Sequence, residues 1–272
     1  MSETPADTRA LARRVRTQCL RMVHRAKASH IGSALSIADL MAVLYGGVMR
    51  VDPRRPDWSE RDRFLLSKGH ACTAAYATLA ETGFFDRALL ETFSRDGSRL
   101  AGHITSGTPG VEVSTGSLGH GLSIACGMAL AAKMNGESYR TFALLSDGEC
   151  DEGSIWEAAM LAGHHHLDNL IVIVDYNKIQ SLGQVSEILD LEPFAAKWGA
   201  FRWAVQEVDG HDVRALTETF AAVPFSAGQP SCVIAHTVKG KGVSFMEDLV
   251  EFHYKPPSDE QLARALAEVE AS

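Results

Sequence analysis

Two polar residues that could share a metal ion follow neighbouring apolar segments of this sequence. Asp147 comes just after the apolar run 142–145, in Ser-Asp-Gly-Glu, and Asn177 follows the run 170–174, in Asp-Tyr-Asn. Both runs are short and rich in branched residues, which is typical of buried parallel strands. Since ligands of open α/β sheets collect outside the carboxyl ends of the strands, we expect a carboxylate and an amide oxygen there to bind one hard cation.

The residue after Asp147 indicates what else could bind at this point. Gly148 would let backbone N–H groups approach a diphosphate, and a helix that starts next to it would direct its positive end to the same place. A cation held by only two side chains keeps positions for phosphate oxygens, as Mg²⁺ prefers. Asp-Gly alone is more often an ordinary turn. Asn177 follows Asp147 at the distance of one strand-helix-strand unit, however, and the pair together favours a metal-diphosphate site.

Strand and helix patterns alternate through most of the chain. We expect strands at 64–66, 142–145, 170–174, 204–208 and 232–235, and helices at 8–28, 36–45, 71–80, 122–134, 154–162 and 213–222. An S-x-x-D signal at Ser36 marks the start of the second helix. The alternation predicts an α/β fold, an open, mostly parallel sheet with helices on both faces.

The chain is predicted to form a single domain over residues 1–272, with a short C-terminal helix near 260–269, because no repeat or Gly/Ser linker divides it. The longest segment without a periodic pattern is the glycine-rich stretch 102–121. Long loops of this kind in compact domains tend to be functional. We therefore expect this stretch to contribute to the site.

Bulk properties exclude several classes of protein. The net charge is −8 and no block of lysine and arginine is present, so nucleic acid is a poor partner. Five cysteines form no C-x-x-C pair and leave one over, which argues against a disulfide framework and a cysteine zinc site. No apolar run has the length of a signal peptide or a membrane span. These features favour a cytoplasmic protein without membrane contact.

The segment 144–180, LLSDGECDEGSIWEAAMLAGHHHLDNLIVIVDYNKIQ, closely resembles the thiamine diphosphate fingerprint of transketolases. Four further segments resemble transketolase motifs in the family's order: SHIGSALSIADL, FLLSKGHA, LAGHITSGTPGVEVSTGSLGHGLSIACGMALA and HTVKGKGVSFME. The resemblance covers residues from about 17 to 255 and is greatest to the N-terminal subunits of bacterial transketolases that are divided between two genes. The chain is therefore identified as a member of the transketolase family.

The resemblance implies which residues bind the metal and the cofactor. Asp147, Asn177 and the main-chain carbonyl of Ile179 are expected to ligate Mg²⁺, or Ca²⁺ or Mn²⁺ in its place, and the metal holds the diphosphate of thiamine diphosphate. The expected cofactor-binding residues are His70, Gly116, Ser117, Leu118, Asp147, Gly148, Glu152, Asn177, Lys239 and His253.

Some of these assignments have a second interpretation. The segment from Gly116 to Leu118 resembles the one that contacts the aminopyrimidine ring. Glu152 matches a glutamate near the dimer interface that communicates with the partner active site, but it could equally be an acid of a first helical turn. Lys239 either reaches the diphosphate or is a mobile loop cation. Glu149 and Asp151 are expected to be solvent or loop residues.

Four histidines match active-site positions of the family, namely His30, His70, His103 and His253. As a set they suit the chemistry, because a ketose donor loses a hydroxyl proton, an aldehyde acceptor gains one, and imidazole does both near neutral pH. His30 and His103 are assigned to substrate hydroxyls, and His70 and His253 to proton transfer and the diphosphate. The run 164–166 is expected to be a helix end, because adjacent helical residues do not share a face that could bind one metal.

The sequence departs from the family at four positions. Full-length transketolases commonly have Gly, Pro, Pro and Gln where this chain has Ser146, Ile31, Ser117 and His120. None of these side chains is an expected metal ligand or proton carrier. The range of acceptors is left open, because two of them adjoin the aminopyrimidine segment and a substrate histidine.

A partner chain is implied by what the sequence lacks. The glutamate that activates the cofactor in this family belongs to a second domain, which is absent here. We expect a transketolase C-terminal subunit, with pyrimidine-binding and C-terminal domains, to supply it in an α2β2 heterotetramer that acts on sugar phosphates.

The resemblance therefore predicts an enzyme that transfers a two-carbon ketol unit from a ketose phosphate donor to an aldose acceptor, active only with its partner. Three alternatives remain. The chain could be the α subunit of a 2-oxo acid dehydrogenase or decarboxylase, although the four histidines speak against it. It could deliver the ketol unit to a specialised acceptor in a dedicated pathway. It could also be a module that only stores or senses the cofactor.

Overall fold

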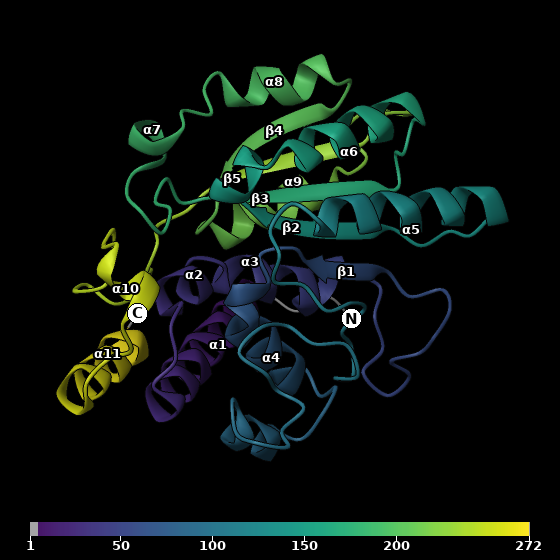
Figure 1. Ribbon diagram of the computed structural model, residues 1–272. Coiled ribbons are helices and arrows are strands. Elements are labelled where there is room, and N and C mark those ends of the chain that lie inside the picture. The colour runs from purple at the N-terminus through teal and green to yellow at the C-terminus, as the bar shows by residue number, and fades with distance from the viewer. Residues whose placement is uncertain (1–4, 272) are drawn as a thin grey trace.

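Five parallel strands form one sheet across the middle of the chain (Figure 1). The computed structural model describes residues 5–271. The strands are β1 Arg63–Leu66, β2 Thr141–Ser146, β3 Leu170–Tyr176, β4 Ala204–Asp209 and β5 Ser231–His236, and their order in the sheet is β1-β2-β3-β5-β4. Every predicted strand is present, and all neighbours pair in parallel. The predicted parallel α/β sheet is confirmed.

Helices lie on both faces of this sheet. The α-helices are α1 Pro5–Ala26, α2 Ile31–Ser36, α3 Ala38–Val43, α4 Cys72–Glu81, α5 Gly121–Asn135, α6 Gly153–His164, α7 Val185–Ile188, α8 Phe194–Ala200, α9 Val213–Ala221, α10 Glu251–Tyr254 and α11 Asp259–Ala271. Shorter turns of helix span Leu44–Val48, Gly69–Ala71, Arg87–Thr92 and Gly148–Asp151. The sequence pattern did not predict α2, α7, α8 and α10, because four to seven residues are too few for a helical period to repeat.

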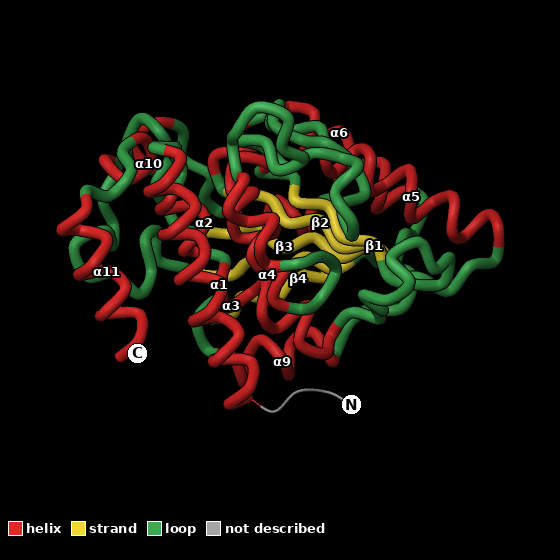
Figure 2. The backbone as a smooth tube through the Cα atoms, turned by 90° about the horizontal axis from the view of Figure 1, so that it is seen from below, coloured by secondary structure: helices red, strands yellow, loops and turns green. Residues whose placement is uncertain are grey.

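Alternate residues of the strands enter two separate hydrophobic cores. Phe142 and Leu144 of β2 belong to the core shared with α1, α2, α3, α4 and α9, whereas Ala143 and Leu145 belong to the core shared with α5, α6 and α8. In Figure 2, α1, α3 and α4 lie in front of the strands. Because both faces are covered, the strands appear in the sequence as continuous apolar runs.

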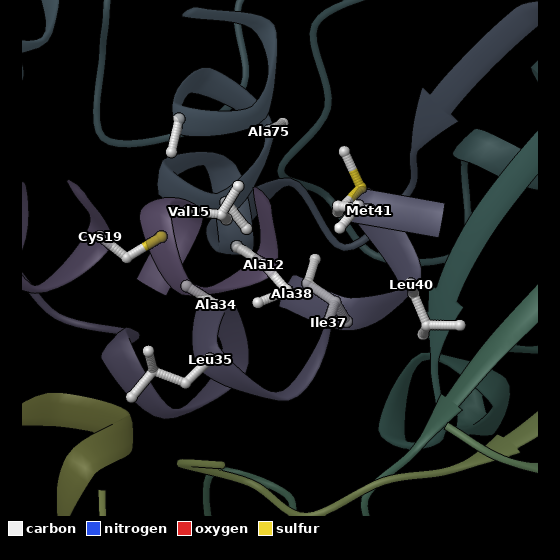
Figure 3. Packing of buried hydrophobic residues seen from close by; sticks show 14 of the residues in the cluster. Ala12, Val15, Cys19, Ala34, Leu35, Ile37, Ala38, Leu40, Met41 and Ala75 are labelled. Atoms are coloured by element: carbon white, nitrogen blue, oxygen red, sulfur yellow. The ribbon is translucent and has the colours of Figure 1, made fainter. Parts of the chain in front are cut away.

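Small side chains let the first helices pack closely (Figure 3). Val15 and Cys19 of α1 lie near Ala34 of α2 and Ala75 of α4, and all four are almost completely buried. Truncation of a buried leucine in such a core costs about 2–5 kcal/mol. This core fixes the position of α2, whose first residue follows His30.

The predicted helix 36–45 is present as α3 and the helical turn Leu44–Val48, but it does not start at Ser36. α2 ends at Ser36, Ile37 interrupts the helix, and α3 starts at Ala38 without a side-chain cap. The Ser36 hydroxyl instead donates to the buried carboxylate of Asp175, and Asp39 accepts from Arg16. The S-x-x-D start signal was therefore wrong, because both side chains bind buried charged groups of distant segments.

The glycine-rich stretch crosses the carboxyl end of β1. The main-chain N–H of Ile104 donates to the carbonyl of Gly69, and the hydroxyl of Thr115 donates to the carbonyl of Leu66. A side chain at Gly69 would meet the Thr115 carbonyl at 2.4 Å, so this position requires a glycine. Among the described residues, no helix is long and apolar enough to cross a membrane.

Candidate active site

A cavity of about 250 Å³ opens at the carboxyl ends of the central strands. It is lined by His30, Ser33, His70, His103, Gly116, Leu118, Ser146, Asp147, Gly148, Asn177, Ile179, Gln180, Ser181, Lys239 and His253. All the predicted site residues line it except Ser117 and Glu152, whose side chains are exposed. Ser33, Ser146, Gln180 and Ser181 line it without having been predicted.

Asp147 and Asn177 meet because β2 and β3 end side by side. Ser146 pairs with Asp175 in the last register position, and Asp147 and Asn177, one and two residues further along their chains, line the cavity. The carboxylate of Asp147 is buried and accepts hydrogen bonds from the main-chain N–H groups of Gly148 and Lys178, at 2.8 and 2.5 Å. Burial, and then the charge of Asp175, raise the pKa of Asp147 to about 6. A cation would offset this unfavourable environment for a carboxylate.

The side-chain amide of Asn177 is fixed in one orientation. Its Nδ2 donates to Oδ2 of Asp175 at 2.8 Å, and its Oδ1 accepts from the main-chain N–H of Ile179 at 3.1 Å. Lys178 between them has a φ of 67°, a turn conformation that is uncommon outside glycine. The turn places both Asn177 and Ile179 in the lining of the cavity.

A buried ion pair behind this wall was not predicted from the sequence. The ammonium of Lys68 lies 2.5 Å from the carboxylate of Asp175, and both side chains are completely buried. Asp175 also accepts hydrogen bonds from Ser36 and Thr237. Burial alone would raise the pKa of Asp175, but the charge of Lys68 lowers it. Both residues lie within motifs of the sequence, yet their spacing gives no sign that they pair.

The four predicted histidines come together around His30. Its ring centroid lies 5.1 Å from that of His70, 5.0 Å from that of His253 and 5.9 Å from that of His103. His30 has a φ of 73°, and its main-chain N–H donates to the carbonyl of His253 at 2.8 Å. Strained backbone of this kind is found at sites where a side chain must be held in one direction.

Three of these rings are buried enough to lose basicity. Burial, and then the charge of His103, lower the pKa of His30 to about 4. Burial, and then Lys239, lower the pKa of His253 to about 3. Burial, and then Lys68, lower the pKa of His70 well below its usual value. Near neutral pH these imidazoles are therefore uncharged, so each ring can both donate and accept a hydrogen bond.

Lys239 is a buried cation at the base of the cavity. Its ammonium donates to the main-chain carbonyl of Ile179 at 2.8 Å and lies 3.1 Å from Nδ1 of His253. Burial, and then the charge of Lys68, lower the pKa of Lys239 to about 8. Because the side chain is only 1% exposed, the alternative of a mobile loop cation is wrong.

Glu149 is not a solvent residue, and that expectation was wrong. Its carboxylate is completely buried and accepts hydrogen bonds from the hydroxyl of Ser67 and from the main-chain N–H groups of Gly119 and Ser146, at 2.5, 2.9 and 3.4 Å. Burial raises the pKa of Glu149. One carboxylate thus ties the ends of β1 and β2 to the segment after Gly116. Asp151 lies partly exposed in the short helical turn, as expected of a loop residue.

The run 164–166 is a helix end, as predicted. α6 ends at His164, and His166 has a φ of 52° with its Nδ1 3.0 Å from the carbonyl of Gly228. Within residues 5–271, no three His, Cys, Asp or Glu side chains are placed to hold a metal ion. A metal at Asp147 and Asn177 would therefore take its other ligands from main-chain and cofactor oxygens.

Comparison with known proteins gives a consistent result. Residues 7–268 match the family model "Transketolase, thiamine diphosphate binding domain". The chain is 44% identical to one subunit of the apulose-4-phosphate transketolase of Phocaeicola vulgatus, with 93% of this chain and 90% of that protein covered. It is 42% identical to the 6-deoxy-6-sulfo-D-fructose transketolase subunit SqwG of a Clostridium species, with 99% and 98% covered.

Solved structures agree with this match. The transketolase of Campylobacter jejuni superposes with a TM-score of 0.92 at 31% identity, over 97% of this chain and 42% of that one. The transketolase of Leishmania mexicana gives a TM-score of 0.90 at 33% identity, over 97% and 41%. The chain thus spans about two fifths of these longer transketolases.

Proposed function

Because this chain belongs to the transketolase family, we propose that it is the cofactor-binding subunit of a two-component transketolase. It would transfer a two-carbon ketol unit from a ketose phosphate donor to an aldose acceptor. The observation that carries the proposal is the single cavity in which Asp147 and Asn177 lie together with the four imidazoles. Asp147 and Asn177 suit a metal-diphosphate group, and the four imidazoles suit proton transfer at sugar hydroxyls.

The described residues fit thiamine diphosphate and a divalent metal, which we propose to be Mg²⁺. Asp147, Asn177 and the carbonyl of Ile179 would hold the metal, since hard cations prefer such oxygen ligands. A side chain at Gly148 would meet that of Gln180 at 3.0 Å, so this part of the cavity wall favours a glycine, whose main-chain N–H could approach phosphate oxygens. The cofactor, when bound, supplies the carbon centre on which the ketol unit is carried.

The chain's own residues would position the sugar and move its protons. The rings of His30 and His103 can accept or donate hydrogen bonds at substrate hydroxyls, because both line the cavity. The ammonium of Lys239 supplies positive charge for the diphosphate. His70 and His253 line the same cavity, which suits transfer of a proton between the sugar and the cofactor.

We propose a partner subunit for two reasons. Relatives of nearly the same length are named as transketolase subunits. Large apolar side chains are also exposed on α5, on α6 and in the segment around α7, namely Met134, Met160, Leu161, Leu182, Ile188 and Leu189. An α2β2 assembly would bury such surface and complete each site.

We also propose a specialised sugar as one substrate and the cytoplasm as the compartment. The related subunits are named for apulose 4-phosphate and 6-deoxy-6-sulfo-D-fructose, which favours a specialised sugar as one substrate here as well. All five cysteines are buried and unpaired, which agrees with a reducing cytoplasm. A 2-oxo acid decarboxylase remains the rival activity.

The test is ketol transfer by this chain alone and mixed with the product of the adjacent gene, with thiamine diphosphate and Mg²⁺. Donors would include xylulose 5-phosphate and the two sugars named above, and pyruvate would test the rival. We expect activity only in the mixture, and loss of it in Asp147→Ala. Failure of the mixture to bind the cofactor would contradict the proposal. Binding of the cofactor without turnover would mean that the enzyme uses a different donor or acceptor sugar.

A further inference from the structure

The segment 116–118 forms one side of the candidate active site, and its flanking residues hold it in place. Gly116 and Leu118 line the cavity. The segment belongs to no helix or strand, so its position depends on side-chain contacts at its two ends. At the first end, the hydroxyl of Thr115 donates to the main-chain carbonyl of Leu66, the last residue of β1, at 2.5 Å.

At the second end, Gly119 is held by two side chains. Its main-chain N–H donates to Oε1 of Glu149 at 2.9 Å, and its main-chain carbonyl accepts from the hydroxyl of Ser154 at 2.9 Å. Gly119 has a φ of 85°, and a side chain there would meet Oγ of Ser154 at 2.5 Å and Cβ of Glu152 at 2.8 Å. The position therefore requires a glycine, and the peptide groups on both of its sides are fixed.

Glu149 joins this segment to the wall that would hold the diphosphate. It belongs to the helical turn Gly148–Asp151, which follows Asp147 directly. Its Oε1 also accepts from the hydroxyl of Ser67 at 2.5 Å, and its Oε2 accepts from the main-chain N–H of Ser146 at 3.4 Å. The hydroxyl of Ser146 in turn accepts from the main-chain N–H of Glu149 at 3.2 Å. One side chain thus connects the ends of β1 and β2 with the segment 116–118.

The carboxylate of Glu149 is buried completely, and the donors named above are all neutral groups. A buried charge without an ion pair costs free energy even when it is hydrogen-bonded. Burial raises the pKa of Glu149, which reflects the same cost. Buried titratable groups of this kind are concentrated at functional sites. The position of Glu149 between two parts of the cavity wall indicates what its function is.

Leu118 marks the part of the cavity that suits the rings of the cofactor. Among the lining residues, only Leu118 and Ile179 have aliphatic side chains, and Ile179 belongs to the proposed metal site. If the diphosphate lies at Asp147 and Gly148, the rings of thiamine diphosphate extend from there into the rest of the cavity. A ring that contacts Leu118 buries apolar surface, which is favourable.

We propose that Glu149 is a positioning residue for the ring end of thiamine diphosphate. Through Gly119 it holds Leu118 in a fixed position relative to the turn that would bind the diphosphate, and it does not itself line the cavity. Once the diphosphate is bound, the rings meet a surface that is already in place, so little ordering of the segment opposes binding. The inference rests on the proposed function, because it requires that this cavity binds the cofactor.

The test compares thiamine diphosphate with inorganic pyrophosphate, which has the diphosphate but no rings. Both are titrated by calorimetry at saturating Mg²⁺ into this chain mixed with the product of the adjacent gene. We expect Glu149→Ala to weaken binding of thiamine diphosphate by roughly tenfold and to leave pyrophosphate unchanged, because only the ring end loses its support. Glu149→Gln keeps an oxygen that can accept from Gly119, and should bind both ligands as the wild type does.

The ratio of the two affinities separates positioning from stability. A variant that merely unfolds more readily loses both affinities by the same factor, so the ratio stays constant. Leu216→Ala truncates a buried side chain of α9 that does not line the cavity, and should behave in this way. Ser154→Ala removes the other side-chain contact of Gly119 and should weaken thiamine diphosphate alone, by a smaller factor. It takes the place of Glu149→Ala in the test if that variant does not fold.

Two negative results have different meanings. A wild-type ratio in Glu149→Ala and Ser154→Ala would overturn the positioning role, although binding of the cofactor by the wild type would still support the proposed function. Absence of binding of both ligands by the wild type would overturn the proposed function, and this inference with it.

Discussion

The ammonium of Lys239 lies 2.8 Å from the main-chain carbonyl oxygen of Ile179, the oxygen that we propose as the third metal ligand. A divalent cation on that oxygen would come close to a buried positive charge, which is repulsive. The same charge attracts a diphosphate. Lys239 should therefore oppose binding of the metal alone and favour binding of the metal together with the cofactor.

Lys239→Met separates these two effects. We expect the affinity for Mg²⁺ without cofactor to rise, because the competing ammonium is removed. We expect the affinity for thiamine diphosphate at saturating Mg²⁺ to fall by roughly tenfold, because one close ion pair with phosphate is lost. Calorimetry of the assembled enzyme measures both. A fall in both affinities would mean instead that Lys239 only holds the loop in position, and Lys239→Arg should then restore them.

Glu149 and Glu152 provide a matched pair of substitutions, since both are acids of the segment after Asp147 but only Glu149 is buried. Glu149→Ala leaves the N–H groups of Gly119 and Ser146 without their acceptor. We expect it to lower the free energy of unfolding by about 2–4 kcal/mol, since unpaired buried donors each cost about 1–3 kcal/mol. Urea denaturation measures this loss in the isolated chain.

Glu152→Ala is the control for that loss. Its exposed side chain should change the free energy of unfolding by less than about 0.5 kcal/mol. If Glu152 communicates with the partner site, its substitution should alter only the kinetics of the assembled enzyme. Equal destabilisation by Glu149→Ala and Glu152→Ala would contradict the structural role assigned to Glu149.

The histidine cluster should stay uncharged in mild acid. The pKa values of His30 and His253, about 4 and about 3, lie below the usual value near 6.5 because burial disfavours the charged form. Nitrogen NMR of the labelled chain between pH 5 and 8 should therefore show neutral rings, with the two signals identified by their loss in His30→Gln and His253→Gln. Titration of either ring near pH 6.5 would show that the cluster is more open to water than the structure indicates.

The sequence predicted those parts of the molecule that depend on local pattern. Five apolar runs gave the five strands, and because parallel strands end at one edge, the meeting of Asp147 with Asn177 followed from their positions. The partners of buried charges could not be predicted in this way. Lys68, after β1, forms an ion pair with Asp175 of β3. Glu149 accepts hydrogen bonds from three segments that are distant in the sequence or end different strands. These contacts form only when the chain has folded.

Ser36 illustrates the same limit. The local pattern predicts a helix start at Ser36. The Ser36 hydroxyl instead donates a hydrogen bond to Asp175, and α3 starts at Ala38, after Ile37. The histidines were found from motif resemblance, whereas their mutual distances and lowered pKa values come only from the fold. Tertiary hydrogen bonds to charged groups therefore override the local signal.

The last prediction concerns Asp39, whose partners Arg16 and His211 hold α1, α3 and the end of β4 together. Burial alone would raise the pKa of Asp39, but Arg16 and then His211 lower it to about 2. The unfolded chain, with a pKa near 3.8, then binds the proton more readily. The stabilisation is therefore complete above about pH 4 and is lost as the pH falls towards 2.

Asp39→Asn should remove this dependence. At pH 7 we expect the variant to be less stable by about 3–5 kcal/mol, because the buried Arg16 loses its counter-ion. The difference in free energy of unfolding between wild type and variant should narrow by about 2 kcal/mol between pH 5 and 2, since only the wild type still has a carboxylate to protonate. Urea denaturation at each pH measures it, and Asp96→Asn, at an exposed position, serves as the control. A difference that stayed constant over this range would mean that Asp39 and Arg16 stabilise the fold by packing and not by charge.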